Sequence, residues 1–112
     1  MEARSVILNL EKLLAQGKES ALLRFSLGTE YFKLGERWVS VFHLKRAIEL
    51  DPDYSAAWKV LGMALAESGI LHEALHTWRR GVEVAEKRGD KQAAKEMQVF
   101  ARRVEKKIAA LK

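Results

Sequence analysis

The chain has 112 residues, of which 48% are hydrophobic and 31% charged, so it can form one domain with a real core and is too apolar to be disordered. It has no cysteine, which excludes disulfides and thiolate metal sites, and no uncharged apolar run approaches the roughly 20 residues that cross a bilayer. The net charge of +5 is concentrated in residues 87–112, where nine basic and three acidic residues leave +6, while residues 1–86 have a net charge of −1.

The predicted elements are six helices, because no segment shows sustained strand-like alternation. In chain order they lie near residues 3–16, 20–34, 38–50, 54–68, 72–87 and 90–111. Glycines that can end a helix in the left-handed conformation follow several of them, at Gly17, Gly35, Gly69 and Gly89. The only proline, Pro52, discourages continuation of the third helix, and Asp53 or Ser55 is expected to cap the fourth. Because the connections are short, consecutive helices should pack as antiparallel neighbours.

The first predicted helix also bears on localisation. Its apolar residues fall at helical spacing, and it lacks the basic start, apolar middle and small-residue cleavage site of a signal peptide. We therefore expect a cytoplasmic protein with no membrane partner.

An internal repeat organises the middle of the chain, since residues 21–54 align with residues 55–88 at an offset of 34. Both copies predict a helix, a turn that contains glycine and a second helix. Gly28 aligns with Gly62, and each costs its helix about 1 kcal/mol relative to alanine. That cost is explained if another helix approaches closely there, with Leu44 and Trp78 as the large residues beside the glycines.

The repeated positions resemble the signature of tetratricopeptide repeat proteins, in a small two-repeat form of bacterial type. The second copy supplies Trp58, Leu61, Gly62, Leu65, Ala74 and Trp78, and the first supplies Leu27, Gly28, Tyr31, Ala47 and Pro52. The departures are Arg24 for the tryptophan, Ser40 for the first alanine, Gly81 for the last alanine and Glu86 for the closing proline.

The resemblance implies an all-α single domain over residues 1–112, in which antiparallel helical hairpins stack as a short right-handed solenoid. Its parts would be an N-terminal packing helix (3–16), repeat 1 (21–54), repeat 2 (55–88) and a basic C-terminal capping helix (90–111). Because about three stacked units are usually needed for stability, the two terminal helices should complete the core.

The resemblance also implies a groove, lined by the first helix of each repeat, that binds a peptide or a partner helix. The positions that carry over are Leu22, Phe25, Thr29, Phe32, Lys33, Ala56, Lys59, Met63 and Glu67, and the last helix would add Ala93, Met97 and Phe100. In the alternative interpretation, Phe25 and Phe32 are simply covered by a terminal helix. A subset of the family clamps a chaperone's C-terminal carboxylate with Lys and Asn, but Phe25, Thr29, Lys59 and Met63 occupy those positions here. That partner class is therefore not expected.

The basic last helix supports an alternative function, the binding of an anion or nucleic acid in a salt-dependent way. The candidate residues are Lys91, Lys95, Arg102, Arg103, Lys106 and Lys107. Glu96 and Glu105 interrupt the basic face and no aromatic residue interleaves it, which favours a solvated capping surface instead.

The segment His72-Glu73-Ala74-Leu75-His76 matches H-E-x-x-H, which can place two zinc ligands and a general base on one helical turn. The repeat explains its central letters without a metal, and a catalytic zinc would also need a third protein ligand, for which Glu96 is the candidate. Both histidines should instead lie on the outer, convex face. His43 is alone and is expected to pack or to lie at the surface.

These patterns together predict an interaction module and not an enzyme, with no metal and no cofactor. We expect its partner to be another protein or a peptide, and the chain itself to be a monomer or a weak homo-oligomer.

Overall fold

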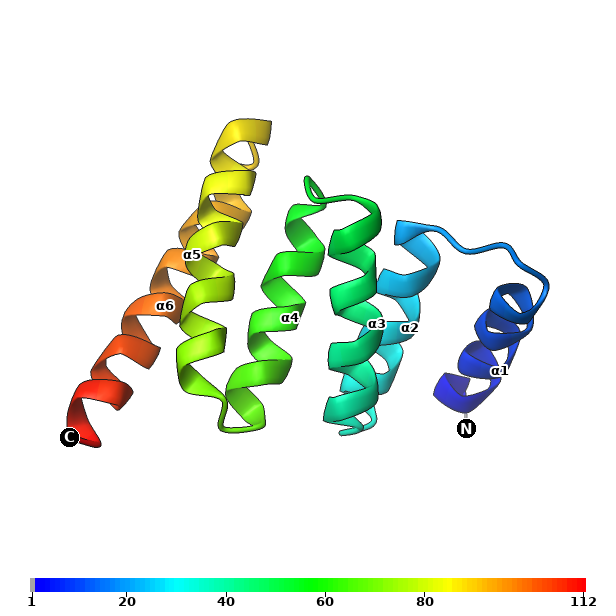
Figure 1. Cartoon of the computed structure of the whole chain (residues 1–112), viewed down its shortest axis with the longest axis horizontal. Helices are drawn as coiled ribbons and strands as arrows, with labels where there is room; N and C mark the ends of the chain where they lie inside the picture. The colour runs from blue at the N-terminus through cyan, green and yellow to red at the C-terminus, as the bar shows by residue number, and fades with distance from the viewer. Residues whose placement is uncertain (1) are drawn as a thin grey trace.

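The structure, a computed structural model, describes residues 2–112, and in this range it consists of six α-helices (Figure 1). The helices are α1 (Glu2–Ala15), α2 (Ala21–Lys33), α3 (Arg37–Leu50), α4 (Ser55–Glu67), α5 (Leu71–Arg88) and α6 (Lys91–Ala110). Each end lies within one residue of the predicted position. The all-α prediction is therefore confirmed.

The helix ends show which local signals fix these boundaries. Gly69 ends α4 in the left-handed conformation, with φ of +79°, and the next residue donates its N–H to the Leu65 carbonyl at 2.9 Å. The Ser20 hydroxyl accepts the N–H of Leu23 and caps α2. The predicted cap of α4 by Asp53 or Ser55 is wrong, because Tyr54 occupies that position and no side chain accepts a cap hydrogen bond there.

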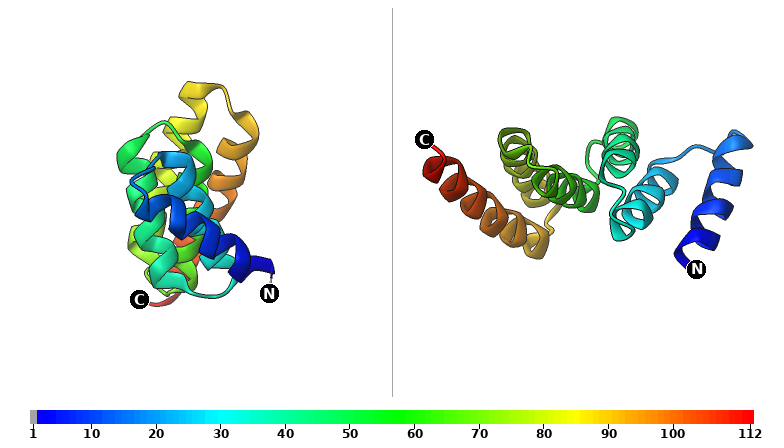
Figure 2. Two further views of the ribbon diagram at one scale, coloured as in Figure 1. Left: turned by 90° about the vertical axis from the view of Figure 1, so that its right-hand side faces the viewer. Right: turned by 90° about the horizontal axis from the view of Figure 1, so that it is seen from below.

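The helices stack as a solenoid in which α2, α4 and α6 lie on one side and α3 and α5 on the other (Figure 2). Each helix packs against the next in sequence, and α4 also contacts α2 and α6. The molecule is elongated, 45 × 30 × 21 Å, so each pair of helices supports mainly its neighbours. None of the helices in the described range is long and apolar enough to cross a membrane.

The predicted close helix crossings occur at equivalent places in both repeats. A Cβ atom on Gly28 would lie 2.5 Å from Cγ of Leu44, and one on Gly62 would overlap the indole ring of Trp78. Hydrogen bonds between the two helices also hold each crossing in place. The hydroxyl of Ser40 donates to the Gly28 carbonyl at 2.7 Å, and the indole N–H of Trp78 donates to the carbonyl of Lys59 at 3.0 Å.

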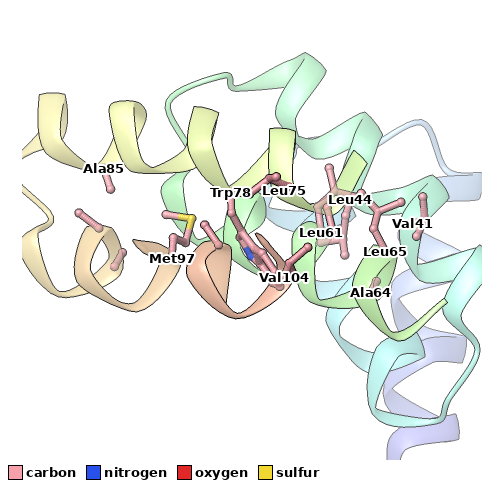
Figure 3. Close-up of a cluster of buried hydrophobic side chains, with 14 residues drawn as sticks. Val41, Leu44, Leu61, Ala64, Leu65, Leu75, Trp78, Ala85, Met97 and Val104 are labelled. Atoms are coloured by element: carbon pink, nitrogen blue, oxygen red, sulfur yellow. The ribbon is translucent and has the colours of Figure 1, made fainter. Parts of the chain in front are cut away.

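The core continues along the stack from α3 to α6 (Figure 3). Leu44, Leu61 and Leu65 fill its centre and are at most 2% exposed. Gly81, which departs from the family signature, leaves space that Met97 of α6 and the Cβ of Trp58 occupy. The apolar face of α6 thereby packs into the core beside α5.

We predict that Gly62→Ala lowers the free energy of unfolding. Overpacking a core of this kind costs roughly 1–3 kcal/mol, against a helix-propensity gain of about 1 kcal/mol. Urea unfolding followed by circular dichroism measures the difference. Glu67→Ala, at the exposed end of the same helix, is the control and should change the free energy by less than about 0.5 kcal/mol. A Gly62→Ala protein as stable as the wild type would contradict a tight crossing.

Candidate functional site

The side of the stack formed by α2, α4 and α6 carries most of the residues predicted to line a groove. Leu22 is 64% exposed, and Lys33 and Glu67 are also exposed. Four others are half-buried, with part of each side chain open to solvent: Phe25, Thr29, Phe32 and Met63. This face thus presents partly exposed apolar side chains, with Lys33 and Glu67 at the C-terminal ends of α2 and α4. We refer to it below as the concave groove, after the groove that the sequence predicts.

The aromatic part of the groove is held by neighbours within the repeats. The rings of Phe25 and Tyr54 lie 4.9 Å apart between centroids, at an angle of 37°. Tyr54 lies between α3 and α4, so the ring that contacts Phe25 does not come from a terminal helix. Partial burial, and then repulsion from Asp51, raises the pKa of the Tyr54 hydroxyl above its ordinary value.

Both lysines of the groove take part in ion pairs. The Lys59 ammonium lies 3.0 Å from the Glu96 carboxylate and joins α4 to α6. Lys33 pairs with Glu30 of the preceding turn at 3.1 Å. Glu96 was not placed in the groove from the sequence, because it was considered only as a metal ligand and as an interruption of the basic face. Since Lys59 is already neutralised, the groove offers no free cation at that position.

Two residues of α6 that were predicted to line the groove are buried instead. Met97 is completely buried and Ala93 is nearly so, because Met97 fills the space beside Gly81. Phe100 is half-buried, with its ring centroid 5.2 Å from that of Trp78. In this respect the predicted groove is wrong, and the contribution of α6 is limited to Phe100 and Glu96.

The six basic residues proposed as an anion site are all exposed along the outer side of α6. They are Lys91, Lys95, Arg102, Arg103, Lys106 and Lys107. None of them takes part in the ion pairs found within residues 2–112, whereas Glu105 on the same helix pairs with Arg79 of α5 at 2.9 Å. The positive charge of this face is therefore not neutralised by the chain itself.

The residues of the H-E-x-x-H segment do not face a common site. His72 and His76 are exposed, and Ala74 is completely buried in the core. The Glu73 carboxylate pairs with Lys45 of α3 at 2.9 Å, and Glu96 pairs with Lys59. The described residues contain no group of three side chains placed to hold a metal ion.

His43, expected to pack or to lie at the surface, is buried at the junction of α1, α2 and α3. Its Nδ1 lies 3.0 Å from Nη1 of Arg24, and its Nε2 lies 3.7 Å from a carboxylate oxygen of Glu11. The ring of Tyr31 stacks on it, with centroids 5.6 Å apart. Because the guanidinium can only donate, Nδ1 must accept, and the ring proton lies on Nε2, facing Glu11.

Arg24 extends this network through the α1–α2 connection. It pairs with Glu19 at 2.7 Å, and Glu19 in turn pairs with Arg46 of α3 at 2.9 Å. Hydrogen bonds from Arg46 and then Arg24 lower the pKa of Glu19 to about 2. Arg24, which replaces the signature tryptophan, therefore links α2 to Glu19 in the connection that precedes it.

The opposite, convex side carries two aromatic residues that the sequence reasoning did not single out. Trp38 is 65% and Phe42 is 64% exposed, one turn apart on α3. The offset of 34 aligns them with His72 and His76, which are also exposed. The repeat alignment could have predicted the exposure of these two aromatic residues, because the histidines at the equivalent positions were expected on the convex face.

Comparison with known proteins gives a consistent result, although no family model matches the chain. It is 46% identical over 101 residues to the TPR repeat-containing protein PA0015 of Pseudomonas aeruginosa, a match that covers 90% of this chain and 96% of that protein. The solution structure of protein BPP2914 from Bordetella parapertussis has a TM-score of 0.82 at 41% identity, covering 94% and 91% of the two chains. The TPR2B domain of yeast Sti1, in a complex with pHsp70, has a TM-score of 0.87 at 15% identity and covers 95% and 85%.

We predict a loss of stability in mild acid that depends on His43. Burial, followed by repulsion from Arg24, lowers the pKa of His43 from 6.5 to about 4. Between these values the unfolded chain binds a proton that the folded chain does not, so stability falls as pH falls through the window. The full effect is about 3 kcal/mol.

Urea midpoints measured from pH 7.5 to pH 4.5 test this linkage. His43→Thr is the matched variant, since Thr77 occupies the equivalent buried position in repeat 2. It should remove the part of the pH dependence that arises from the histidine. Identical pH profiles for the two proteins would show that His43 does not titrate in this way.

Proposed function

The chain belongs to the tetratricopeptide repeat family, and from this premise we propose that it is a non-catalytic module for protein–protein interaction. The partner, a peptide or a helix, binds in the concave groove of α2, α4 and α6. The fold of these repeats presents a large surface without a reaction centre, which suits binding and not chemistry.

The observation that carries the proposal is the partly open apolar floor of the groove. Leu22 on α2 and Met63 on α4 keep surface in water, and Phe25 of α2 packs on Tyr54, the residue before α4. Complete burial of a side chain such as leucine or methionine is worth about 1.5–3 kcal/mol relative to full exposure. A few such anchors supply the affinity of a transient, micromolar complex after the entropic cost of association.

The charges of the groove indicate the chemistry of its partner. Lys59 is paired with Glu96, Phe25 has no hydrogen-bond donor on its side chain, and the hydroxyl of Thr29 is buried. The TPR2B domain of yeast Sti1, which has the same fold, forms a complex with pHsp70. We expect the partner here to be held by apolar side chains, with flexible methionine contacts that adapt to it.

A peptide selected from a random library against the whole chain tests this function. Its NMR shift changes should be concentrated on α2, α4 and α6, and Met63→Glu should weaken binding at least about tenfold, which is a loss of 1.4 kcal/mol. His76→Glu, on the convex side, is the control and should leave the affinity unchanged. The proposal fails if selected peptides contact only the convex side, or if Met63→Glu has no effect.

The exposed basic face of α6 favours a second candidate function, the binding of an anionic partner such as nucleic acid. Its six cations lie on one helix and are not paired within the described residues, so they are free to contact phosphates. Because such contacts release counterions, affinity must fall steeply with salt.

Titration with a DNA duplex and with RNA at two salt concentrations distinguishes this candidate. If all six cations contact phosphates, the affinity should fall about 1,000-fold between 50 and 200 mM salt. A triple variant, Lys95→Gln, Arg102→Gln and Lys106→Gln, should weaken binding and flatten the salt dependence, while Lys45→Gln on α3 should not. Absence of binding at 50 mM salt excludes the candidate.

A further inference from the structure

We propose that the convex side of the N-terminal half is a self-association surface through which two copies of the chain form a dimer. Its centre is an exposed apolar patch on α1, α3 and the end of α2, which we call the N-terminal patch. The patch comprises Leu8, Leu34, Trp38, Val39 and Phe42. Three of its five residues lie on α3, on the side of the stack opposite the concave groove, so the inference does not depend on the proposed function.

Exposed apolar residues are distributed unevenly along the solenoid. Nine of the eleven large hydrophobic residues that are exposed in the described range lie before residue 51, and only Val99 and Leu111 lie after it. The C-terminal end is covered instead by the basic residues of α6. Contiguous exposed apolar surface on a small protein typically marks an interaction site.

The repeats provide an internal comparison for the two aromatic residues of the patch. Trp38 and Phe42 occupy the positions of His72 and His76, which are exposed and polar in the second copy of the same hairpin. The hairpin therefore folds without an aromatic residue at either position. In repeat 1 about two thirds of each aromatic residue stays in water, and contacts within the chain cover only the remainder, which indicates that they act in an interface.

A hollow of about 310 Å³ adjoins these residues, between α1 and the connection of α2 to α3. Leu8, Leu34 and Val39 line it, so its walls are apolar and partly exposed. Arg4 stands on the α1 side of the hollow and Glu36 on the opposite side. Neither of these two side chains forms an ion pair among the described residues.

This combination fits a second copy of the chain better than an unrelated partner. Two aromatic side chains and an apolar hollow lie on one face, so a two-fold axis places the aromatic residues of each copy over the hollow of the other. The same axis brings Arg4 of one copy towards Glu36 of the other, and two unpaired charges of opposite sign then neutralise each other. The net charge of α1 is zero, with Glu2, Arg4, Glu11 and Lys12, so two copies do not repel at this end.

The geometry also indicates the strength of the dimer. Fully exposed aromatic residues present about 150–250 Å² each, so Trp38 and Phe42 together present roughly 250 Å². An interface built around them belongs to the small class that buries less than about 1,200 Å² in total, which is typical of transient complexes. The Arg24 guanidinium lies 5.6 Å from the centroid of the Phe42 ring and fixes its orientation before association.

Sedimentation equilibrium of the whole chain, from about 5 to 500 µM, tests the proposal in the range expected for a weak dimer. The average mass should rise with concentration from that of one chain towards that of two. The double variant Trp38→His and Phe42→His, which introduces the residues of repeat 2, should raise the dissociation constant at least about 30-fold. Its circular dichroism and urea midpoint should match the wild type, because both positions are exposed.

Two further variants make the outcome specific. Leu22→His, at a position as exposed as Phe42 but on the groove side, should leave the dissociation constant unchanged. Arg4→Glu should weaken the dimer, and Arg4→Glu combined with Glu36→Arg should restore it. A single-chain mass at every concentration overturns the proposal, as does a dimer that survives the double histidine variant or is broken by Leu22→His.

Discussion

The structure depends on the close crossing of two helices within each repeat. Glycine at positions 28 and 62 lets the second helix approach until Leu44 or Trp78 occupies the space where a Cβ would be. Because the crossing recurs after 34 residues, successive hairpins adopt the same geometry and stack in one direction. The terminal helix α6 then closes this end of the core by inserting Met97 beside Gly81 of α5.

A stack of this kind uses only part of each helix for folding, and the remaining faces can differ in chemistry. The side of α2, α4 and α6 has an apolar floor crossed by the Lys59–Glu96 ion pair. The convex side of α3 exposes two aromatic residues, and the outer side of α6 exposes unpaired cations. The groove and the convex aromatic residues lie on opposite sides of the stack, so a dimer on the convex side leaves the groove open for a partner.

The sequence predicts the fold closely because its determinants are local. Glycines, a proline and a repeat length of 34 place every helix end within one residue. It predicts surfaces less well, because exposure depends on neighbours that a repeat alignment does not show. Met97 was expected in the groove, but it fills the hollow left by Gly81, and Arg24 was noted only as a departure although it contacts His43. Trp38 and Phe42 were missed because the family signature concerns buried positions.

The most direct test of the account is the solution geometry of the two glycine crossings. NOESY spectra of the labelled protein should show strong contacts from the Gly62 α-protons to the Trp78 indole ring, with those protons shifted upfield by the ring current. Equivalent contacts should link the α-protons of Gly28 to the methyl groups of Leu44. Ordinary random-coil shifts for Gly62 and no cross-peaks at either crossing would contradict a stack built on these contacts.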